Sequence, residues 1–353
     1  MIKKIVLLPG DGVGPEVTKA TEIILGAVGD QFNLDLSMRS FAFGGAAIDS
    51  AGDPLPPETL TACQDADAVF LGAVGGPKWD GQAIRPETGL LRLRKALDVF
   101  ANLRPTRIYK RLLDRSPLRT VTPKTDFLIV RELVGGIYFG DRSEGSETAS
   151  DVCLYHRHEV ERIARVAFEA AQKRSGRLVS VDKANVLASS RLWRGVVTDL
   201  GARDYPDVTV DHMLVDAMAM RLIQAPDDFD VIVTENMFGD ILSDEASVIS
   251  GSIGLSPSAS LGDTGKGLYE PIHGSAPDIA GEDIANPVGA IASAAMLLRH
   301  SFNAEAPARA IETAIETVLA AGHLTRDLGG DLACTAMTGK VLAALEKAFA
   351  SSH

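Results

Sequence analysis

Residues 5–17 read IVLLPGDGVGPEV, and this stretch sets the fold class. A four-residue apolar run ends at Pro9-Gly10 and a helical pattern begins at Glu16, so the sequence predicts a strand, a tight turn and a helix. The glycine spacing is G-x-G-x-G, and Pro15 stands where the dinucleotide-binding fingerprint G-x-G-x-x-G has its last glycine. Pro15 suits the first position of a helix, where its missing N–H costs nothing. The Rossmann fingerprint therefore fails, and the motif leaves open whether the turn is structural or contacts a ligand.

The same alternation of short apolar runs and longer helical patterns continues along the chain. Strands are expected at residues 5–8, 68–71, 127–130, 178–181, 208–210 and 231–234, and helices at 16–27, 88–100, 159–173 and 308–320. This alternation is typical of an α/β protein with a partly parallel sheet. At roughly 150 residues per domain the length predicts two domains, but no repeat or Pro/Gly/Ser-rich linker marks a boundary.

The composition argues against nucleic acid and membranes as partners. Of the 353 residues, 35 are basic and 47 acidic, and the formal charge of −12 repels phosphate backbones and anionic lipids. The basic segment 107–119 is interpreted as a solvated loop, because Tyr109 is the single aromatic within it. No signal-peptide pattern or run of 18 apolar residues occurs, and Cys63, Cys153 and Cys334 lie outside any C-x-x-C motif. We therefore expect reduced thiols and a cytoplasmic location.

A constellation of carboxylates follows one apolar run. Residues 228–245 read DFDVIVTENMFGDILSDE, in which a buried strand leads into a helix that carries Asp240 and Asp244. Like charges four residues apart on one helical face repel unless a cation sits between them. Hard oxygen ligands at such a turn suit Mg²⁺ or Mn²⁺. The alternative, a solvated acidic face, is weakened by the apolar residues around the pair.

Three arginines are candidates for binding carboxylates. Arg104 and Arg131 stand at the ends of strand-like runs, where a guanidinium needs either a local ion pair or a bound carboxylate. Arg94 shares one helical face with three residues at helical spacing, namely Glu87, Leu90 and Leu91. This face fits a ligand with a branched alkyl group and an anionic end, whereas burial of the leucines in the core is the simpler alternative. Together the three arginines would match a dicarboxylate.

Two more residues and one loop are candidates for catalysis and binding. Lys183 ends a strand-like run and Tyr138 lies in a Gly-rich segment. Near a divalent cation a lysine can act as a base and a tyrosine as an acid, although each alone is better explained as a surface or packed residue. Residues 268–287 are rich in Gly, Pro and small polar residues, as binding loops are. His273 in this loop has no second histidine at ligand spacing, and Asn286 also fits a plain helix start.

Taken together, and over nearly the whole chain, these motifs resemble the isocitrate/isopropylmalate dehydrogenase family of metal-dependent β-decarboxylating dehydrogenases. The matching segments are PGDGVGPEV (9–17), GAVGGPKWD (72–80), RPETGLLRLRK (85–95), ANLRP (101–105), RELVGGIYFG (131–140), VDKANVL (181–187), VDAMAM (215–220), ENMFGDILSDE (235–245) and EPIHGSAPDIAG (270–281). Within the family the resemblance is strongest to the branch that acts on 3-isopropylmalate. It implies oxidative decarboxylation of that substrate to 4-methyl-2-oxopentanoate and CO₂, with reduction of NAD⁺, in leucine biosynthesis.

The resemblance implies a role for each matched residue. The malate carboxylates would be held by Arg94, Arg104 and Arg131, and the rest of the substrate would lie against Glu87, Leu90, Leu91 and Asp216. Mg²⁺ or Mn²⁺ would be bound by Asp216, Asp240 and Asp244. Lys183 would take the hydroxyl proton, and Tyr138 would protonate the enolate left after CO₂ departs. NAD would be bound by Glu270, His273, Gly274, Ser275, Ala276, Asp278 and Asn286, with Asp278 accepting from the adenosine ribose.

The resemblance also implies a two-domain fold of mixed sheets flanked by helices, which is not a Rossmann fold. A discontinuous, cofactor-binding first domain would comprise residues 1–99 and 252–353, and a dimerisation domain residues 100–251. In the implied homodimer, Lys183 and Asp216 of one chain would complete the active site of the other.

Other activities of this family are the closest alternatives: isocitrate, homoisocitrate, and D-malate or tartrate dehydrogenation. Isocitrate enzymes carry a serine-containing S-x-N segment where this chain has residues 87–91, and a third carboxylate would be poorly served by Leu90 and Leu91. The alternative of a different class is a non-catalytic regulatory or RNA-binding relative. Lys183, Tyr138 and the three aspartates argue against it.

Overall fold

The computed structural model describes residues 2–350, which divide into two compact units. Unit 1 comprises the residues up to Val99, then Tyr109–Arg115, and the residues from Ser250 onward. Unit 2 comprises Phe100–Ile108 and Ser116–Ile249. Each unit has strands of a mixed sheet with helices packed against them, so the predicted α/β class is confirmed.

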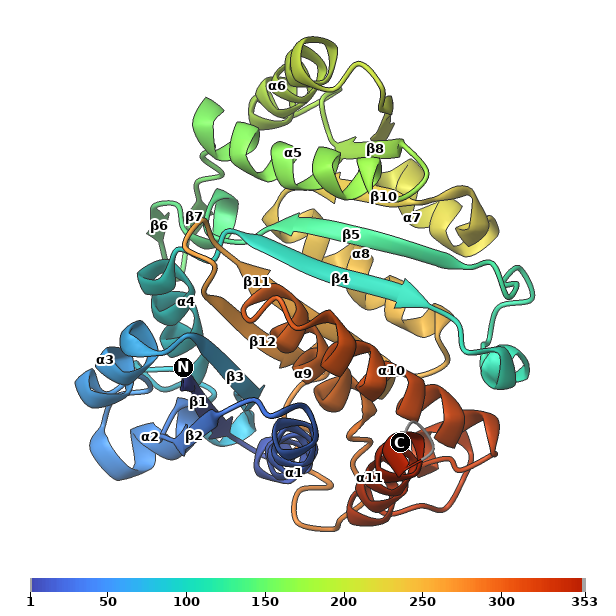
Figure 1. Cartoon of the computed structure of the whole chain (residues 1–353). Coiled ribbons are helices and arrows are strands. Elements are labelled where there is room, and N and C mark those ends of the chain that lie inside the picture. Colours follow the sequence, from blue (N-terminus) through green and yellow to red (C-terminus); the bar gives the residue numbers. More distant parts are fainter. Residues whose placement is uncertain (1, 351–353) are drawn as a thin grey trace. The chain divides into compact units, whose positions relative to one another are not determined.

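Unit 1 is built on five strands in the order β2-β1-β3-β12-β11 (Figure 1). These are β1 (Lys3–Gly10), β2 (Leu36–Ser40), β3 (Ala68–Ala73), β11 (Pro257–Leu261) and β12 (Gly267–Pro271). Its helices are α1 (Gly14–Phe32), α2 (Gly44–Ala51), α3 (Pro57–Asp65), α4 (Pro86–Leu97), α9 (Val288–His300), α10 (Glu305–Ala320) and α11 (Cys334–Ala350), with short 3₁₀ turns at Pro77–Trp79, Lys110–Arg115, Ile253–Leu255 and Arg326–Leu328. The pairing is parallel except between β11 and β12. Strand β3 is buried along its whole length, as expected for a parallel strand covered on both faces.

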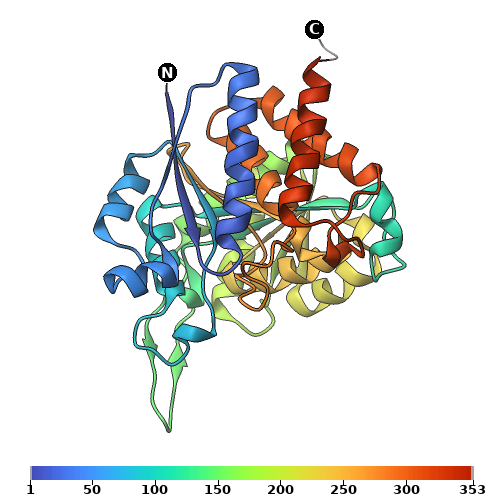
Figure 2. The same ribbon diagram turned by 90° about the horizontal axis from the view of Figure 1, so that it is seen from below.

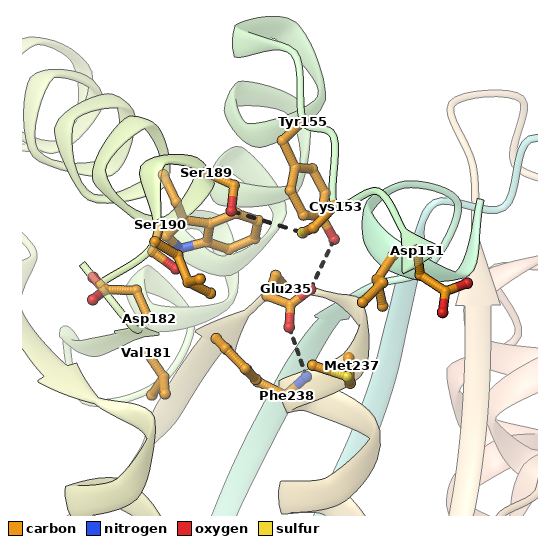
Figure 3. A pocket seen from close by; sticks show the side chains of 13 residues that line it. Asp151, Cys153, Tyr155, Val181, Asp182, Ser189, Ser190, Glu235, Met237 and Phe238 are labelled. Carbon is orange, nitrogen blue, oxygen red and sulfur yellow. Dashed lines mark hydrogen bonds between the residues drawn. The ribbon is translucent and has the colours of Figure 1, made fainter. Parts of the chain in front are cut away.

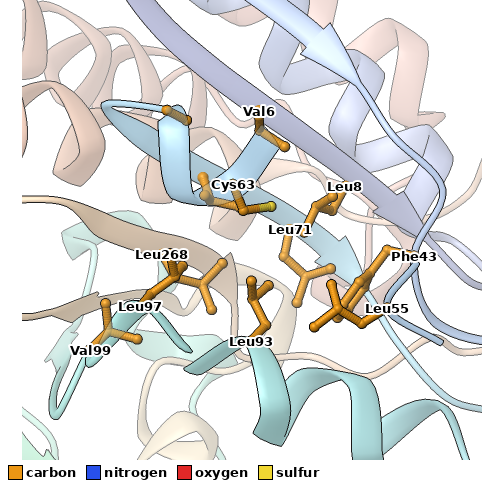
Figure 4. Packing of buried hydrophobic residues seen from close by; sticks show 12 residues of the cluster. Val6, Leu8, Phe43, Leu55, Cys63, Leu71, Leu93, Leu97, Val99 and Leu268 are labelled. Carbon is orange, nitrogen blue, oxygen red and sulfur yellow. The ribbon is translucent and has the colours of Figure 1, made fainter. Parts of the chain in front are cut away.

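Helix α4 packs on the core of unit 1 through Leu93. Leu93 is fully buried against Leu71 and Leu268, whose strands β3 and β12 lie side by side (Figure 4). Helix α4 ends at Leu97 and does not extend to residue 100 as predicted, because Asp98 adopts a left-handed conformation with φ of 48° that closes the helix.

Unit 2 is built on the strand order β4-β5-β10-β8-β9. These are β4 (Ala101–Arg107), β5 (Asp126–Glu132), β8 (Arg177–Asp182), β9 (Thr209–Leu214) and β10 (Val231–Thr234). Its helices are α5 (Arg157–Gln172), α6 (Ala188–Asp204), α7 (Val215–Gln224) and α8 (Asn236–Ile249), with 3₁₀ turns at Gly136–Tyr138 and Pro226–Asp228 and a small hairpin of β6 (Arg142–Ser143) and β7 (Ser150–Asp151). Figure 1 shows α5 and α6 on one side of the strands and α7 and α8 on the other, and in Figure 2 the hairpin extends away from the rest of its unit.

The predicted strands correspond to β1, β3, β5, β8, β9 and β10, and the predicted helices to α1, α4, α5 and α10. One expected position is wrong: Arg104 lies in the middle of β4, which runs on to Arg107 and pairs with β5 along its whole length. Among residues 2–350, the helices are all too short or too polar to cross a bilayer.

Candidate active site

Five of the predicted site residues meet at one end of the unit 2 sheet. Asp240, in the first half of α8, accepts a hydrogen bond from Arg131 on β5 and one of 2.9 Å from the Tyr138 hydroxyl. Arg104 on the adjacent strand β4 has its guanidinium 3.6 Å from Asp240 and 3.3 Å from Asp244. The antiparallel register places Asn102 opposite Arg131, so the two arginines leave neighbouring strands at nearly the same height. The result is a cluster of two carboxylates, two guanidinium groups and one phenol.

Burial and charge at this cluster keep the tyrosine protonated, and the two carboxylates have the chemistry of cation ligands. Burial raises the pKa of Asp244, the neighbouring Asp240 charge raises it further, and Arg104 opposes both effects. Burial and the adjacent Asp240 raise the pKa of Tyr138 to about 12, so its hydroxyl carries a proton at neutral pH. Two carboxylates that repel each other and retain exposed oxygen are a suitable donor set for a hard divalent cation.

Lys183 and Asp216 form a separate pair in the same unit. Lys183 follows the last residue of β8, and its Nζ lies 2.5 Å from a carboxylate oxygen of Asp216 in the first turn of α7. The hydrogen bond from Lys183 lowers the pKa of Asp216. Within the described residues, the carboxylate oxygens of Asp216, Asp240 and Asp244 do not all lie within 4.8 Å of one another. Within one chain the structure therefore brings together two of the three predicted metal ligands.

The α4 face predicted to meet the substrate divides into two parts. Leu90 packs against the core cluster, whereas Leu91 is half-buried outside it and Glu87 is exposed. Arg94 is buried, and its Nη2 donates to Glu270 at 2.8 Å. The Nε of Arg94 is also buried and has no hydrogen-bond partner among the described residues. The core interpretation thus fits Leu90 better than Leu91, and Arg94 keeps one donor available for a ligand.

The loop between β12 and α9 encloses part of a cavity of about 210 Å³ within unit 1. Four predicted cofactor residues line it, namely His273, Gly274, Ala276 and Asn286, together with Val13, Ser252, Asp327 and several apolar side chains. The Nε2 of His273 is buried and has no hydrogen-bond partner in the described part of the chain. Burial lowers the pKa of this ring, which favours the neutral form. An orphaned ring nitrogen that borders a cavity fits a polar ligand such as a nucleotide.

The other predicted cofactor residues do not line this cavity. Glu270 binds Arg94, Asp278 is exposed, and Ser275 offers its carbonyl oxygen to the backbone N–H of Val13 at 2.8 Å.

The glycine turn after β1 is a structural support for that loop. Gly12 has φ of +57°, and a Cβ there would lie 1.9 Å from the carbonyl oxygen of Ser275. The buried carboxylate of Asp11 accepts backbone N–H groups from Gly45, Ala46 and Gly75 at 2.8–2.9 Å. The turn therefore packs directly on the loop between β12 and α9. Sequence reasoning missed Asp11, although an acidic residue within a glycine turn is a signal that could have been used.

Comparisons with known proteins identify the family of this chain. Residues 4–341 match the model of the family described as isocitrate/isopropylmalate dehydrogenase. The chain is 56% identical to 3-isopropylmalate dehydrogenase of Bacillus licheniformis, over 98% of this chain and 96% of the relative, and 57% identical to that of Priestia megaterium, over 93% and 91%. Among solved structures it resembles isocitrate dehydrogenase from Methylococcus capsulatus, with TM-score 0.88 and 33% identity over 97% and 99% of the two chains. It also resembles a β-decarboxylating dehydrogenase from Thermococcus kodakarensis, with TM-score 0.82 and 36% identity over 99% and 97%. The chain belongs to the isocitrate/isopropylmalate dehydrogenase family.

Proposed function

We propose that this chain catalyses the oxidative decarboxylation of 3-isopropylmalate to 4-methyl-2-oxopentanoate and CO₂, with reduction of NAD⁺, in leucine biosynthesis. The observation that carries the proposal is the shared name of relatives that are 53–57% identical over nearly the whole chain. The cluster around Asp240 supports it, because it combines carboxylate-binding guanidinium groups with a proton donor.

The residues of this chain divide the chemistry between them. Arg94, Arg104 and Arg131 bind the two carboxylates of the substrate as planar, charge-assisted donors. Lys183 accepts the hydroxyl proton as the substrate is oxidised, and Tyr138, whose raised pKa keeps it protonated, donates a proton to the carbon that loses CO₂. A divalent cation held by Asp240 and Asp244 of one chain would stabilise negative charge on the substrate oxygens, and NAD⁺ would accept the hydride.

The alkyl group of the substrate is assigned to α4. Leu91 is half-buried and outside the core cluster, so its side chain can cover an apolar group, while an extra carboxylate there would lose its hydration without a partner. The test is an NADH absorbance assay with 3-isopropylmalate, isocitrate, D-malate and tartrate in parallel. We expect the highest kcat/KM for 3-isopropylmalate. If kcat/KM is higher for one of the other acids, the substrate assignment is wrong and the chain has another activity of the family.

NAD is preferred to NADP in this proposal. The exposed carboxylate of Asp278 on the cofactor loop would repel a 2′-phosphate and accept a hydrogen bond from a free 2′-hydroxyl. Unit 1 is accordingly the cofactor-binding unit. Equal kcat/KM values with the two cofactors would contradict this preference.

The proposal includes a homodimer with shared active sites, formed through unit 2. Two observations support it. Lys183 and Asp216 form an ion pair that is separate from the cluster around Asp240. In addition, apolar side chains are exposed on α7 and α8. The exposed apolar residues are Met220, Ile223, Ile241 and Val248. A cytoplasmic location also stays part of the proposal, in keeping with the three unpaired cysteines.

Mixed dimers test the shared site. Lys183→Met and Asp240→Asn chains, each nearly inactive alone, are refolded together in equal amounts. In every mixed dimer one site contains both substitutions and the other site contains neither. Random pairing makes about half the dimers mixed, so about a quarter of all sites are intact. Activity should therefore recover to about a quarter of the wild-type value. If a tag pull-down shows mixed dimers but activity stays at the parental level, both residues serve one chain.

A further inference from the structure

A buried tyrosine outside the predicted site connects the two segments that carry Tyr138 and Asp240. Tyr155 lies just before α5, is 5% exposed, and packs its ring edge-to-face on Trp193 with ring centres 5.7 Å apart. Its hydroxyl points to the junction of β10 and α8, as Figure 3 shows. Nothing in the proposed mechanism uses this hydroxyl.

On one side, the Tyr155 hydroxyl fixes the turn that leads to Tyr138. It donates toward Glu132 at 3.2 Å, and the same carboxyl group accepts the N–H groups of Val134 and Gly135 at 3.0 and 2.9 Å. A Cβ on Gly136, the residue at φ +71° that begins the 3₁₀ turn to Tyr138, would lie 2.4 Å from the hydroxyl oxygen. The turn is therefore shaped around this oxygen.

On the other side, the hydroxyl fixes the first turn of the helix that carries Asp240. It accepts the backbone N–H of Asn236 at 3.0 Å and lies 3.3 Å from a carboxyl oxygen of Glu235. The second oxygen of Glu235 accepts the N–H of Phe238 at 2.8 Å (Figure 3). These hydrogen bonds satisfy N–H groups at the start of α8 that have no partner within the helix.

Asn236 closes the connection between the two segments. Its side-chain amide donates to the carbonyl of Gly135 at 3.0 Å, and its oxygen accepts from Arg131 at 2.8 Å. Apart from the half-buried Val134, the residues of this network are buried. In such surroundings hydrogen bonds hold their partners in one arrangement, and a polar group without a partner is costly.

We propose that Tyr155 is a positioning residue, whose hydroxyl holds the Tyr138 turn against the start of α8 and so sets the hydrogen bond between Tyr138 and Asp240 for proton donation. The inference rests on the proposed role of Tyr138 as the acid. Tyr155 touches neither substrate nor cofactor in this account, and it acts through the backbone of the two segments.

The experiment is a double-mutant cycle in the full-length enzyme. Tyr155→Phe removes only the hydroxyl. Ser189→Ala is the matched control, because Ser189 lines the same pocket and its hydroxyl oxygen accepts a hydrogen bond from Cys153. We expect Tyr155→Phe to lower kcat roughly tenfold with the KM for 3-isopropylmalate within about twofold, because a misplaced proton donor slows the chemistry more than binding. Ser189→Ala should keep wild-type kcat. In a Tyr138→Phe background the Tyr155→Phe change should cost less than about twofold, since the residue it positions is already gone.

A purely structural Tyr155 would lower kcat by the same factor in both backgrounds, and that result overturns the inference. A solvent isotope effect on kcat gives an independent reading: it should rise in Tyr155→Phe, and an unchanged value also overturns the inference. If Tyr155→Phe does not fold, Glu235→Gln takes its place, because this substitution turns an NH₂ group toward the Tyr155 hydroxyl. Its effect on kcat is then compared in the wild-type and Tyr138→Phe backgrounds. A wild-type enzyme inactive on 3-isopropylmalate would instead count against the proposed function, so the two failures can be told apart.

Discussion

The Asp240 cluster of unit 2 and the His273 cavity of unit 1 are built on opposite principles. In the cluster, Arg104, Arg131 and Tyr138 already have carboxylate partners within the chain. In the cavity, Nε2 of His273 has no hydrogen-bond partner within residues 2–350, and the walls come largely from loop residues. A ligand at the cluster must replace existing ion pairs, whereas a ligand at the cavity completes a missing hydrogen bond. Charge-changing substitutions should therefore act strongly at the first and weakly at the second.

The largest effect is expected for Asp240→Asn. The change removes the charge that Arg131 and the Tyr138 hydroxyl share and weakens the proposed cation site, so kcat/KM for 3-isopropylmalate should fall by roughly 10²–10³-fold or more. Activity across a Mn²⁺ titration measures it. Asp211→Asn, an exposed carboxylate on β9, is the control and should stay near wild type. An Asp240→Asn enzyme with nearly full activity would remove the cluster from the mechanism.

The buried carboxyl group of Glu132, the last residue of β5, should make stability depend on pH. Burial raises the pKa of Glu132 from 4.5 to about 7, so between these values the folded chain holds a proton that the unfolded chain has lost. This contribution to stability is complete below pH 4.5 and is lost as the pH rises through 7, by about 3 kcal/mol.

Glu132→Gln tests this dependence, because glutamine does not titrate. Relative to wild type, the free energy of unfolding of Glu132→Gln should increase by roughly 2–3 kcal/mol between pH 5 and pH 8, as measured by urea denaturation. Glu144→Gln, an exposed site in the β6–β7 hairpin, serves as control. A difference between variant and wild type that stays constant with pH would mean that Glu132 is already ionised at pH 5.

A smaller effect is expected on α4, where Leu90 and Leu91 should separate stability from specificity. Leu91→Ser should lower kcat/KM for 3-isopropylmalate roughly 10–200-fold, a loss of about 1–3 kcal/mol of transition-state stabilisation, because one apolar contact to the alkyl group is lost. The kcat/KM for D-malate should fall less. Leu90→Ser should mainly lower the melting temperature, because Leu90 packs on the core. Equal losses on both substrates for Leu91→Ser would make Leu91 a packing residue as well.

The smallest effect is expected at the cavity. His273→Phe keeps an aromatic ring but removes the unpartnered nitrogen, so the KM for NAD should rise by roughly five- to tenfold, with little change in kcat. Steady-state kinetics at saturating 3-isopropylmalate measures both constants. An unchanged KM for NAD would mean that the cofactor does not use this nitrogen, and the contrast between the two regions would then rest on the cluster alone.

Local sequence patterns predicted the elements that are short and apolar, such as β3 and β10, and the spacing that places Asp240 and Asp244 on one helical face. They could not predict pairings between distant residues. Arg94 binds Glu270 across 176 positions, and Arg131 binds Asp240 across 109, and neither pairing leaves a local pattern.

Other differences arise where tertiary packing overrides a local pattern. Asp98 ends α4 through a backbone conformation that residue type alone does not indicate. Tyr155 carries no motif, and the role proposed for it depends on two distant segments that meet at its hydroxyl, one at Glu132 and the other at Glu235 and Asn236.

The stoichiometry of the products shows whether this chain couples oxidation to decarboxylation at a cation-dependent site. NADH and CO₂ are measured together as the purified enzyme consumes 3-isopropylmalate, with Mg²⁺ or Mn²⁺ present and after its removal by EDTA. Each substrate molecule consumed should yield one NADH and one CO₂. Removal of the metal should abolish both products, and return of the cation should restore them. NADH formed without CO₂, or turnover that is unaffected by EDTA, would contradict the proposed mechanism.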